Sequence, residues 1–196
     1  MSILLLAGSP SIPSRSTRLL HHIGERLAAL GHRYSKLHVL DLPAQALVQA
    51  DFNNAELKLA KAQVEQADAV VIATPVYKAA YSGVLKAFLD VLPQDGLSGK
   101  LVLPLATGGS QSHMLALDYA LRPVLSSLGA KQVLPSIYAT DAQINWTTGP
   151  GLTLDPSIAQ RVADGVEQLS ANLLALHSTN PAEFTPVPFS QVRCSV

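Results

Sequence analysis

The sequence predicts an α/β fold in which five parallel strands form one doubly wound sheet with helices on both faces. Short apolar runs alternate along the chain with longer stretches of helical periodicity, a pattern typical of successive strand–helix–strand units. Residues 3–6 and 69–73 are apolar at every position, as in parallel strands that are buried on both faces. A hydrophobic content of 48% in 196 residues suffices for one well-buried domain, which we expect over residues 1–177.

The elements follow in regular order. A strand at residues 3–6 leads to a helix that begins near Ser14 to Ser16 and ends at Gly31, a residue that tolerates the left-handed conformation. Later strands are expected at 33–40, 69–73, 101–106 and 133–138, and later helices at about 54–67, 84–92, 112–128 and 158–176. Residues 41–54 and 140–155 are expected to be irregular connections, and residues 178–196 an extended or disordered tail. This alternation gives most simply the flavodoxin-like strand order 2-1-3-4-5.

Composition excludes several classes of protein. Lysine plus arginine and aspartate plus glutamate number 14 each, with no long charged run, so we expect no contact with nucleic acid or an anionic membrane. Cys194 is the only cysteine, which excludes an internal disulfide, and the histidines show no metal-ligand spacing, so no metal site is expected. The first apolar run is too short for a secretory signal and no run approaches a membrane span, so a cytoplasmic protein is expected.

The loop after the first strand is the most distinctive stretch of the chain. Ser9, Ser14, Arg15 and Ser16 lie where a helix begins, and the unpaired N–H groups of a helix start attract anions, so the loop is typical of a phosphate site. It lacks the glycine–lysine pattern of a nucleoside triphosphate loop and the glycines of a dinucleotide loop, and it contains no cysteine. A terminal phosphomonoester remains, with FMN as the leading candidate. The alternative is an ordinary polar turn between strand and helix.

Two further loops are expected beside the first, because the carboxyl ends of neighbouring parallel strands meet at one edge of the sheet. Residues 75–77 follow the third strand and offer a stiff, apolar edge for a flat ring. Residues 107–109 follow the fourth strand, and their glycines let backbone N–H groups approach the polar rim of that ring. In the alternative interpretation, Tyr77 covers the end of the sheet and the glycines form only a turn before a helix.

Three motifs carry a resemblance to a known family: Gly8-Ser9-Pro10 with Ser14-Arg15-Ser16, the run from Thr74 to Gly83, and the run from Pro104 to Gly109. They resemble the NADPH-dependent FMN reductases, and most closely the reductase component of two-component alkanesulfonate monooxygenases. The resemblance implies reduction of FMN by NADPH and delivery of FMNH2 to a partner monooxygenase. It also implies that FMN contacts Ser9, Ser14, Arg15 and Ser16 at its phosphate, Pro75, Val76 and Tyr77 at its ring, and Thr107, Gly108 and Gly109 at its polar edge.

Several alternatives stay open at this point. No ribose-reading motif distinguishes NADPH from NADH, and FMN could be a tightly bound group or a substrate. A flavodoxin-type electron carrier is one rival, although its docking surface would be strongly acidic and this chain is balanced in charge. A quinone or azo-dye reductase with tightly held FMN is another. For hydride transfer itself no catalytic acid or base is expected, because the protein contributes placement.

The helix expected at 112–128 carries a second signal. Pro123 lacks the N–H that would bond the carbonyl of Tyr119, so we expect a kink or wide turn there. The resemblance to the FMN reductase family also implies a role for Tyr119, because it matches a tyrosine that is linked in that family to an irregular turn and to tetramer assembly. Tyr119 points away from the expected core face together with Leu115, so subunits are expected to pair through this helix as a dimer or tetramer. The core face is expected to comprise Met114, Leu117, Leu121, Val124 and Leu128.

Overall fold

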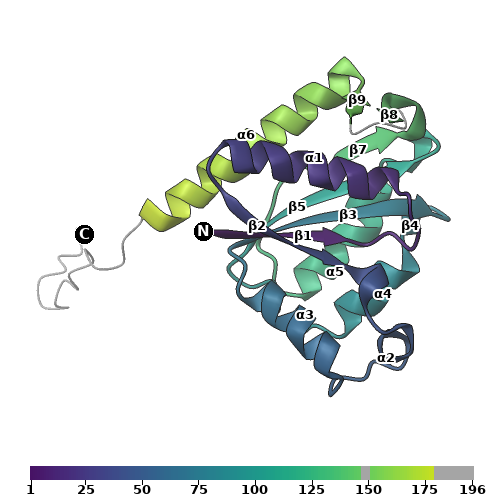
Figure 1. The fold of residues 1–196 in the computed structure, drawn as a ribbon, viewed down its shortest axis with the longest axis vertical. Coiled ribbons are helices and arrows are strands. Elements are labelled where there is room, and N and C mark those ends of the chain that lie inside the picture. Colours follow the sequence, from purple (N-terminus) through teal and green to yellow (C-terminus); the bar gives the residue numbers. More distant parts are fainter. Residues whose placement is uncertain (147–150, 179–196) are drawn as a thin grey trace, which may run out of the picture.

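Helices cover both faces of a central sheet in the computed structural model, which describes residues 1–146 and 151–178 (Figure 1). The strands are β1 (Ser2–Ala7), β2 (Arg33–His38), β3 (Ala69–Tyr77), β4 (Ala80–Tyr81), β5 (Leu101–Gly108), β6 (Gln132–Val133), β7 (Ile137–Thr140), β8 (Ile144–Trp146) and β9 (Leu152–Leu154). The helices are α1 (Arg15–Ala29), α2 (Ala44–Val48), α3 (Ala55–Glu65), α4 (Gly83–Asp90), α5 (Arg122–Ser127) and α6 (Pro156–Ser178). Short 3-10 turns lie at Val39–Asp41, Gln111–His113 and Asp141–Gln143, and a π-helical turn at Leu117–Leu121.

Parallel pairing gives the sheet the order β2-β1-β3-β5-β6, with β7 also paired to β5. This is the predicted order 2-1-3-4-5, because β5 is the fourth predicted strand and β6 and β7 share the place of the fifth. In the register, Leu4 lies beside Ser35 of β2 and Val70 of β3. The strands of this path run parallel, so their carboxyl ends gather at one edge, at the right in Figure 1.

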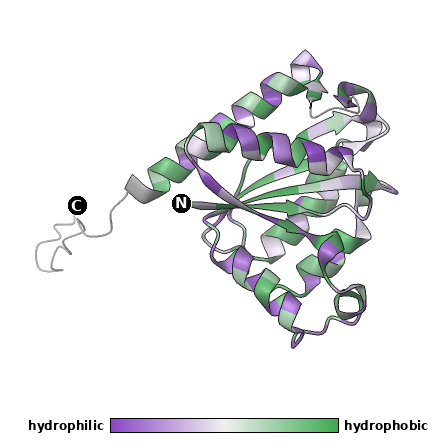
Figure 2. Cartoon of the chain, in the orientation of Figure 1, coloured by the Kyte–Doolittle hydropathy of each residue, from purple (hydrophilic) through white to green (hydrophobic). Residues whose placement is uncertain are grey.

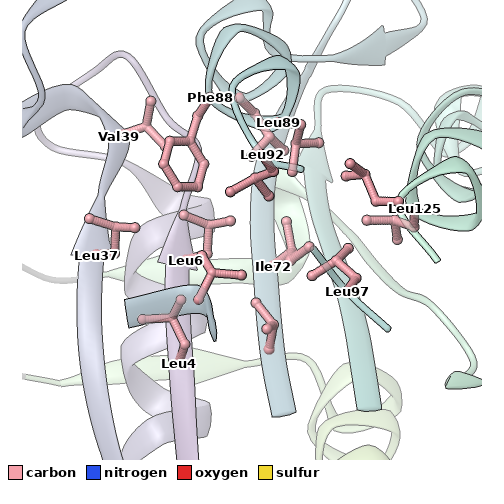
Figure 3. Close-up of a cluster of buried hydrophobic side chains, with 14 of the residues drawn as sticks. Leu4, Leu6, Leu37, Val39, Ile72, Phe88, Leu89, Leu92, Leu97 and Leu125 are labelled. Atoms are coloured by element: carbon pink, nitrogen blue, oxygen red, sulfur yellow. The ribbon is translucent and has the colours of Figure 1, made fainter. Parts of the chain in front are cut away.

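Alternate residues of each central strand enter two separate cores. Leu4 and Leu6 pack with Ile72 and with Phe88 on the side of α3, α4 and α5, as Figure 3 shows. Ile3 and its alternate neighbours pack on the other side, beneath α1 and α6. Both faces are therefore covered, which explains why the central strands are hydrophobic along their length while the helices carry hydrophilic residues on their outer sides (Figure 2).

Helix α1 begins and ends where the sequence predicts. Ser14 is its N-cap, and the Ser14 hydroxyl accepts a hydrogen bond of 3.3 Å from the backbone N–H of Thr17. Gly31 follows its C-terminal end with φ of 87°, which few other residues adopt without strain. Leu20 and Ile23 are fully buried against the sheet. The start of the helix, and with it the first loop, is thereby fixed above β1.

Several predicted stretches differ from the structure. The strand expected at 133–138 is interrupted between β6 and β7, because Pro135 has no N–H for the ladder. The connection expected at 41–54 contains α2, which Pro43 precedes without losing any helical hydrogen bond. The connection expected at 140–155 contains the antiparallel pair β8–β9, and Ile144, Leu152 and Leu154 pack on the core beneath α1 and α6.

The helix expected at 112–128 is not continuous. The backbone N–H of Arg122 bonds the carbonyl of Leu117, five residues earlier, so the chain widens into a π-helical turn around Tyr119, at the place that Pro123 predicts. The expected core face is only partly correct. Leu117, Leu121 and Leu128 are buried as expected, but Met114, which lies in a turn before the π-helical segment, is 43% exposed, and Leu125 rather than Val124 is fully buried.

The predicted tail at 178–196 lies outside the described residues apart from Ser178, the last residue of α6. Within the described ranges, none of the helices combines the length and the apolar character that crossing a bilayer requires.

Candidate active site

Three loops at the carboxyl edge of the sheet enclose one cleft of about 280 Å³. They follow β1, β3 and β5, as the strand order predicts. All the predicted flavin-contacting residues except Ser16 line it, whereas four larger hollows, of about 690, 470, 730 and 320 Å³, contain none of them. The lining residues are Ser9, Ser11, Pro13, Ser14, Arg15, Pro75, Val76, Tyr77, Thr107, Gly108, Gly109 and Asp141.

The first loop presents hydroxyls and a guanidinium at the start of α1. Arg15 is the first residue of that helix, directly after its N-cap. The Ser9 hydroxyl accepts a hydrogen bond of 3.2 Å from the backbone N–H of Ser11, which folds the loop back on itself. Ser16 is buried, and its hydroxyl lies 2.9 Å from that of Ser14. Ser16 therefore supports Ser14 from behind instead of lining the cleft.

A buried serine that the sequence analysis did not single out anchors this loop. Ser82, the N-cap of α4, donates from its hydroxyl to the carbonyl of Gly8 and accepts from the backbone N–H of Leu85 at 3.2 Å. A Cβ added to Gly8 would lie 2.8 Å from the Cβ of Leu85, so only glycine fits this close approach. In the sequence, Ser82 lies directly before a stretch of helical periodicity, which is the signal of a helix N-cap.

The second loop is a tight hairpin between β3 and β4. Tyr77 pairs with Ala80, and between them Lys78 and Ala79 have φ of 50° and 62°. Two successive positive φ values are typical of a type I′ turn, which matches the twist of the strands that it joins. The hairpin holds Tyr77 at the rim of the cleft with 47% of its surface exposed.

The third loop combines a crowded glycine with an open one. A Cβ on Gly108 would lie 2.6 Å from the hydroxyl oxygen of Tyr138, whereas a Cβ on Gly109 would meet no atom within 4 Å. The Tyr138 hydroxyl donates to the carbonyl of Ser110 at 2.6 Å and so fixes the loop. Burial, assisted by the negative charge of Asp141, raises the pKa of Tyr138 and keeps it a donor. The backbone of Gly109 thus faces free space at a fixed position.

Asp141 belongs to the site, although the sequence analysis placed it in an irregular connection. Its Oδ2 atom lies 3.6 Å from Nη1 of Arg15. The two residues are far apart in the sequence, but both line the same cleft. An isolated aspartate after a strand gives no sequence signal of such a contact. Asp141 gives the cleft one negative side chain facing its guanidinium.

The chemistry available in the cleft is therefore recognition of an anion beside a flat, partly apolar surface. Hydroxyls, a guanidinium and a helix start can bind a phosphate, and the apolar edge and open backbone can hold a ring. In the part of the chain that the structure describes, no three histidine, cysteine, aspartate or glutamate side chains are grouped to hold a metal ion.

The sequence matches a family model and known proteins. A family model described as NADPH-dependent FMN reductase matches residues 1–144. The chain is 48% identical over 144 residues to an FMN reductase (NADPH) of Escherichia coli, covering 74% of this chain and 75% of the relative. It is 42% identical to an FMN reductase (NADPH) of Pseudomonas putida over 85% of each chain.

A solved structure extends the similarity to the fold. The apo form of an NADH:FMN oxidoreductase, EMOB, is 40% identical to this chain, with a TM-score of 0.80 over 92% of each chain. An oxidoreductase from Corynebacterium diphtheriae is 28% identical with a TM-score of 0.76, covering 89% of this chain and 97% of the other. The extent and identity of these matches show that this chain belongs to the NADPH-dependent FMN reductase family.

Proposed function

We propose that the cleft binds FMN and that the protein transfers a hydride to it from NADPH. The observation that carries the proposal is the convergence of an arginine-bearing helix start, an apolar edge and an open glycine backbone in one cleft. Ser9, Ser14 and Arg15 would hold the phosphate, with Ser16 orienting Ser14 through their hydroxyl contact.

The ring of FMN fits the remaining walls of the cleft. Pro75, Val76 and Tyr77 supply a rigid apolar edge, because the hairpin turn fixes Tyr77. At the other wall, residues 107–109 would bring backbone N–H groups to the polar rim, and the open space at Gly109 leaves room for that approach. Donors at this rim would stabilise negative charge that develops on reduction.

Bound FMN would supply the hydride acceptor, and the residues of the cleft would place the two reactants and limit water. Tyr77 lines the cleft yet is 47% exposed, so the nicotinamide can approach from the solvent side. The sequence has no separate dinucleotide-binding fingerprint of its own for the pyridine nucleotide, so we infer that NADPH stacks over the same cleft. No side chain needs to act as acid or base in this step.

We further propose that the FMNH2 formed serves a flavin-dependent monooxygenase of the alkanesulfonate type. This finer proposal rests on the resemblance of the three loop motifs. A homo-oligomer formed through the π-helical turn is proposed on a different observation. Tyr119 is 79% exposed, and the nearby Leu115 is 49% exposed, which together form an apolar patch of the kind that subunits cover.

Steady-state oxidation of NADPH and of NADH, with and without added FMN, tests the activity. We expect NADPH oxidation that depends on free FMN. An electron carrier would show no turnover, and a quinone or azo-dye reductase with tightly held FMN would turn over without added FMN when its acceptor is present. Either result would overturn the proposed reaction.

Substitution of Arg15 tests the site. Loss of one charge-assisted contact costs about 1.5–3 kcal/mol, so Arg15→Ala is expected to weaken FMN binding about ten- to a hundredfold. Riboflavin lacks the phosphate, so its affinity should change little. An equal loss for both ligands would show that Arg15 does not contact the phosphate.

A further inference from the structure

Arg15, the residue proposed to receive the phosphate, faces a carboxylate of its own chain. Its Nη1 atom lies 3.6 Å from Oδ2 of Asp141, and both side chains line the cleft. The two side chains are 40% and 45% exposed, so the pair is accessible to a ligand that enters from solvent. Any phosphate that binds Arg15 must therefore meet the negative charge of Asp141.

The position of Asp141 is set by the fold. Thr140, directly before it, lies opposite Gly108 in the pairing of β7 with β5. The side chain of Gln143 accepts from the backbone N–H of Thr140 at 2.9 Å and from its hydroxyl at 3.1 Å, which closes the 3-10 turn. Ile144 then enters the core with 2% exposure. The carboxylate is thus carried on a turn anchored at both ends.

We propose that Asp141 is a specificity-determining residue that holds Arg15 when no phosphate is bound and competes with the flavin phosphate for it. The proposal rests on the proposed function, in which Arg15 binds that phosphate. The carboxylate carries one negative charge and stands near the start of α1, where the helix itself favours an anion. The carboxylate of Asp141 therefore pairs with Arg15 in place of the phosphate when no FMN is bound.

Competition has a definite sign. A phosphomonoester carries a charge of about −1.5 to −2 at neutral pH, so it attracts Arg15 more strongly than a single carboxylate does and displaces Asp141 from it. The negative charge of Asp141 nevertheless remains close by and repels the phosphate. FMN is therefore bound more weakly than the hydroxyls and Arg15 alone would allow, and riboflavin, without a phosphate, is not affected. A flavin that must leave after reduction to reach another enzyme requires such moderated affinity.

The test is Asp141→Asn, which keeps the size of the side chain and removes its charge. Dissociation constants for FMN and riboflavin are measured by quenching of flavin fluorescence, at low and at high salt. We expect FMN to bind about three- to tenfold more tightly and riboflavin to be unchanged. The gain for FMN should shrink at high salt, because the charges are partly exposed.

Two variants serve as controls. Asp164→Asn removes the same charge from the exposed side of α6, and it should leave the FMN dissociation constant unchanged. Asp141→Ala repeats the loss of charge without the amide, and the thermal melting temperature of each variant verifies that it folds. FMN should bind more tightly to Asp141→Ala as well.

The outcomes separate this inference from the proposed function. If Asp141→Asn leaves FMN binding unchanged or weakens it, while Arg15→Ala still weakens FMN selectively, Asp141 does not compete and the inference is wrong. If Arg15→Ala affects FMN and riboflavin alike, the proposed phosphate site itself is wrong. Tighter FMN binding in both Asp141 variants, with selective loss in Arg15→Ala, supports both.

Discussion

Substitution of Ser82 by alanine is expected to destabilise the protein more than loss of a helix cap alone. The Ser82 hydroxyl caps α4 through the backbone N–H of Leu85 and also donates to the carbonyl of Gly8. Ser82 and Leu85 are fully buried, so water cannot replace either contact in Ser82→Ala. The variant thus removes a cap and leaves a carbonyl of the first loop without its donor.

The two losses can be estimated separately. An N-cap contributes about 1 kcal/mol, and a buried polar group left without a partner costs about 1–3 kcal/mol. The free energy of unfolding should therefore fall by about 2–4 kcal/mol, which for a chain of this size lowers the melting temperature by about 5–15 °C. Urea denaturation and thermal melting, followed by circular dichroism, measure both quantities.

Asn54→Ala is the matched control. Asn54 caps α3 through its side-chain oxygen, which accepts from the backbone N–H groups of Glu56 and Leu57 at 3.0 and 3.2 Å, near the surface. Its loss should cost only the cap, about 1 kcal/mol. Equal destabilisation by Ser82→Ala and Asn54→Ala would refute the reasoning, because the buried carbonyl of Gly8 would then contribute nothing.

Two further predictions concern pH and assembly. Burial, then the charges of Lys36 and of His38, lower the pKa of His21 from 6.5 to about 4. Between these two pH values the side chain of His21 is protonated in the unfolded chain but not in the folded one. The free energy of unfolding should therefore decline as the pH falls from 6.5 towards 4. Urea titrations at neutral pH and at about pH 5 measure this decline, which His21→Gln should reduce. An equal decline in the parent protein and in His21→Gln would contradict the prediction. Tyr119→Ala should shift the sedimentation coefficient to a smaller assembly, whereas Leu174→Ala, 54% exposed on α6, should not; an unchanged oligomer in Tyr119→Ala would leave Tyr119 as ordinary surface.

Much of the fold could be predicted from the sequence because its signals are local. Runs such as residues 3–6 and 69–73 are apolar throughout only when both faces of a strand are covered, and the handedness of strand–helix–strand units then leaves few strand orders. The meeting of the three loops followed from that order, since the carboxyl ends of β1, β3 and β5 share one edge. The sequence also contained the signal for the interrupted last strand, in Pro135.

Other features depend on contacts between distant parts of the chain. Asp141 is significant only because the pairing of β7 with β5 brings it to Arg15, and Ser82 because it reaches Gly8. Leu125 is fully buried and Val124 only partly, although both lie within about 60° of Leu121 on a regular helix, so the elements packed against the helix decide which is covered. Local periodicity identifies elements, but not which distant residues contact them.

The π-helical turn also connects the proposed assembly surface to the cleft. Its residues pack against β4, the second strand of the hairpin that holds Tyr77 at the cleft. A partner subunit seated on Tyr119 would therefore press on the π-helical turn, and through it on this hairpin, whose two-residue turn has positive φ at both positions. Because the hairpin is stiff, displacement of β4 would be transmitted to Tyr77 and Val76. Assembly and flavin binding should thus be coupled through one short antiparallel pair.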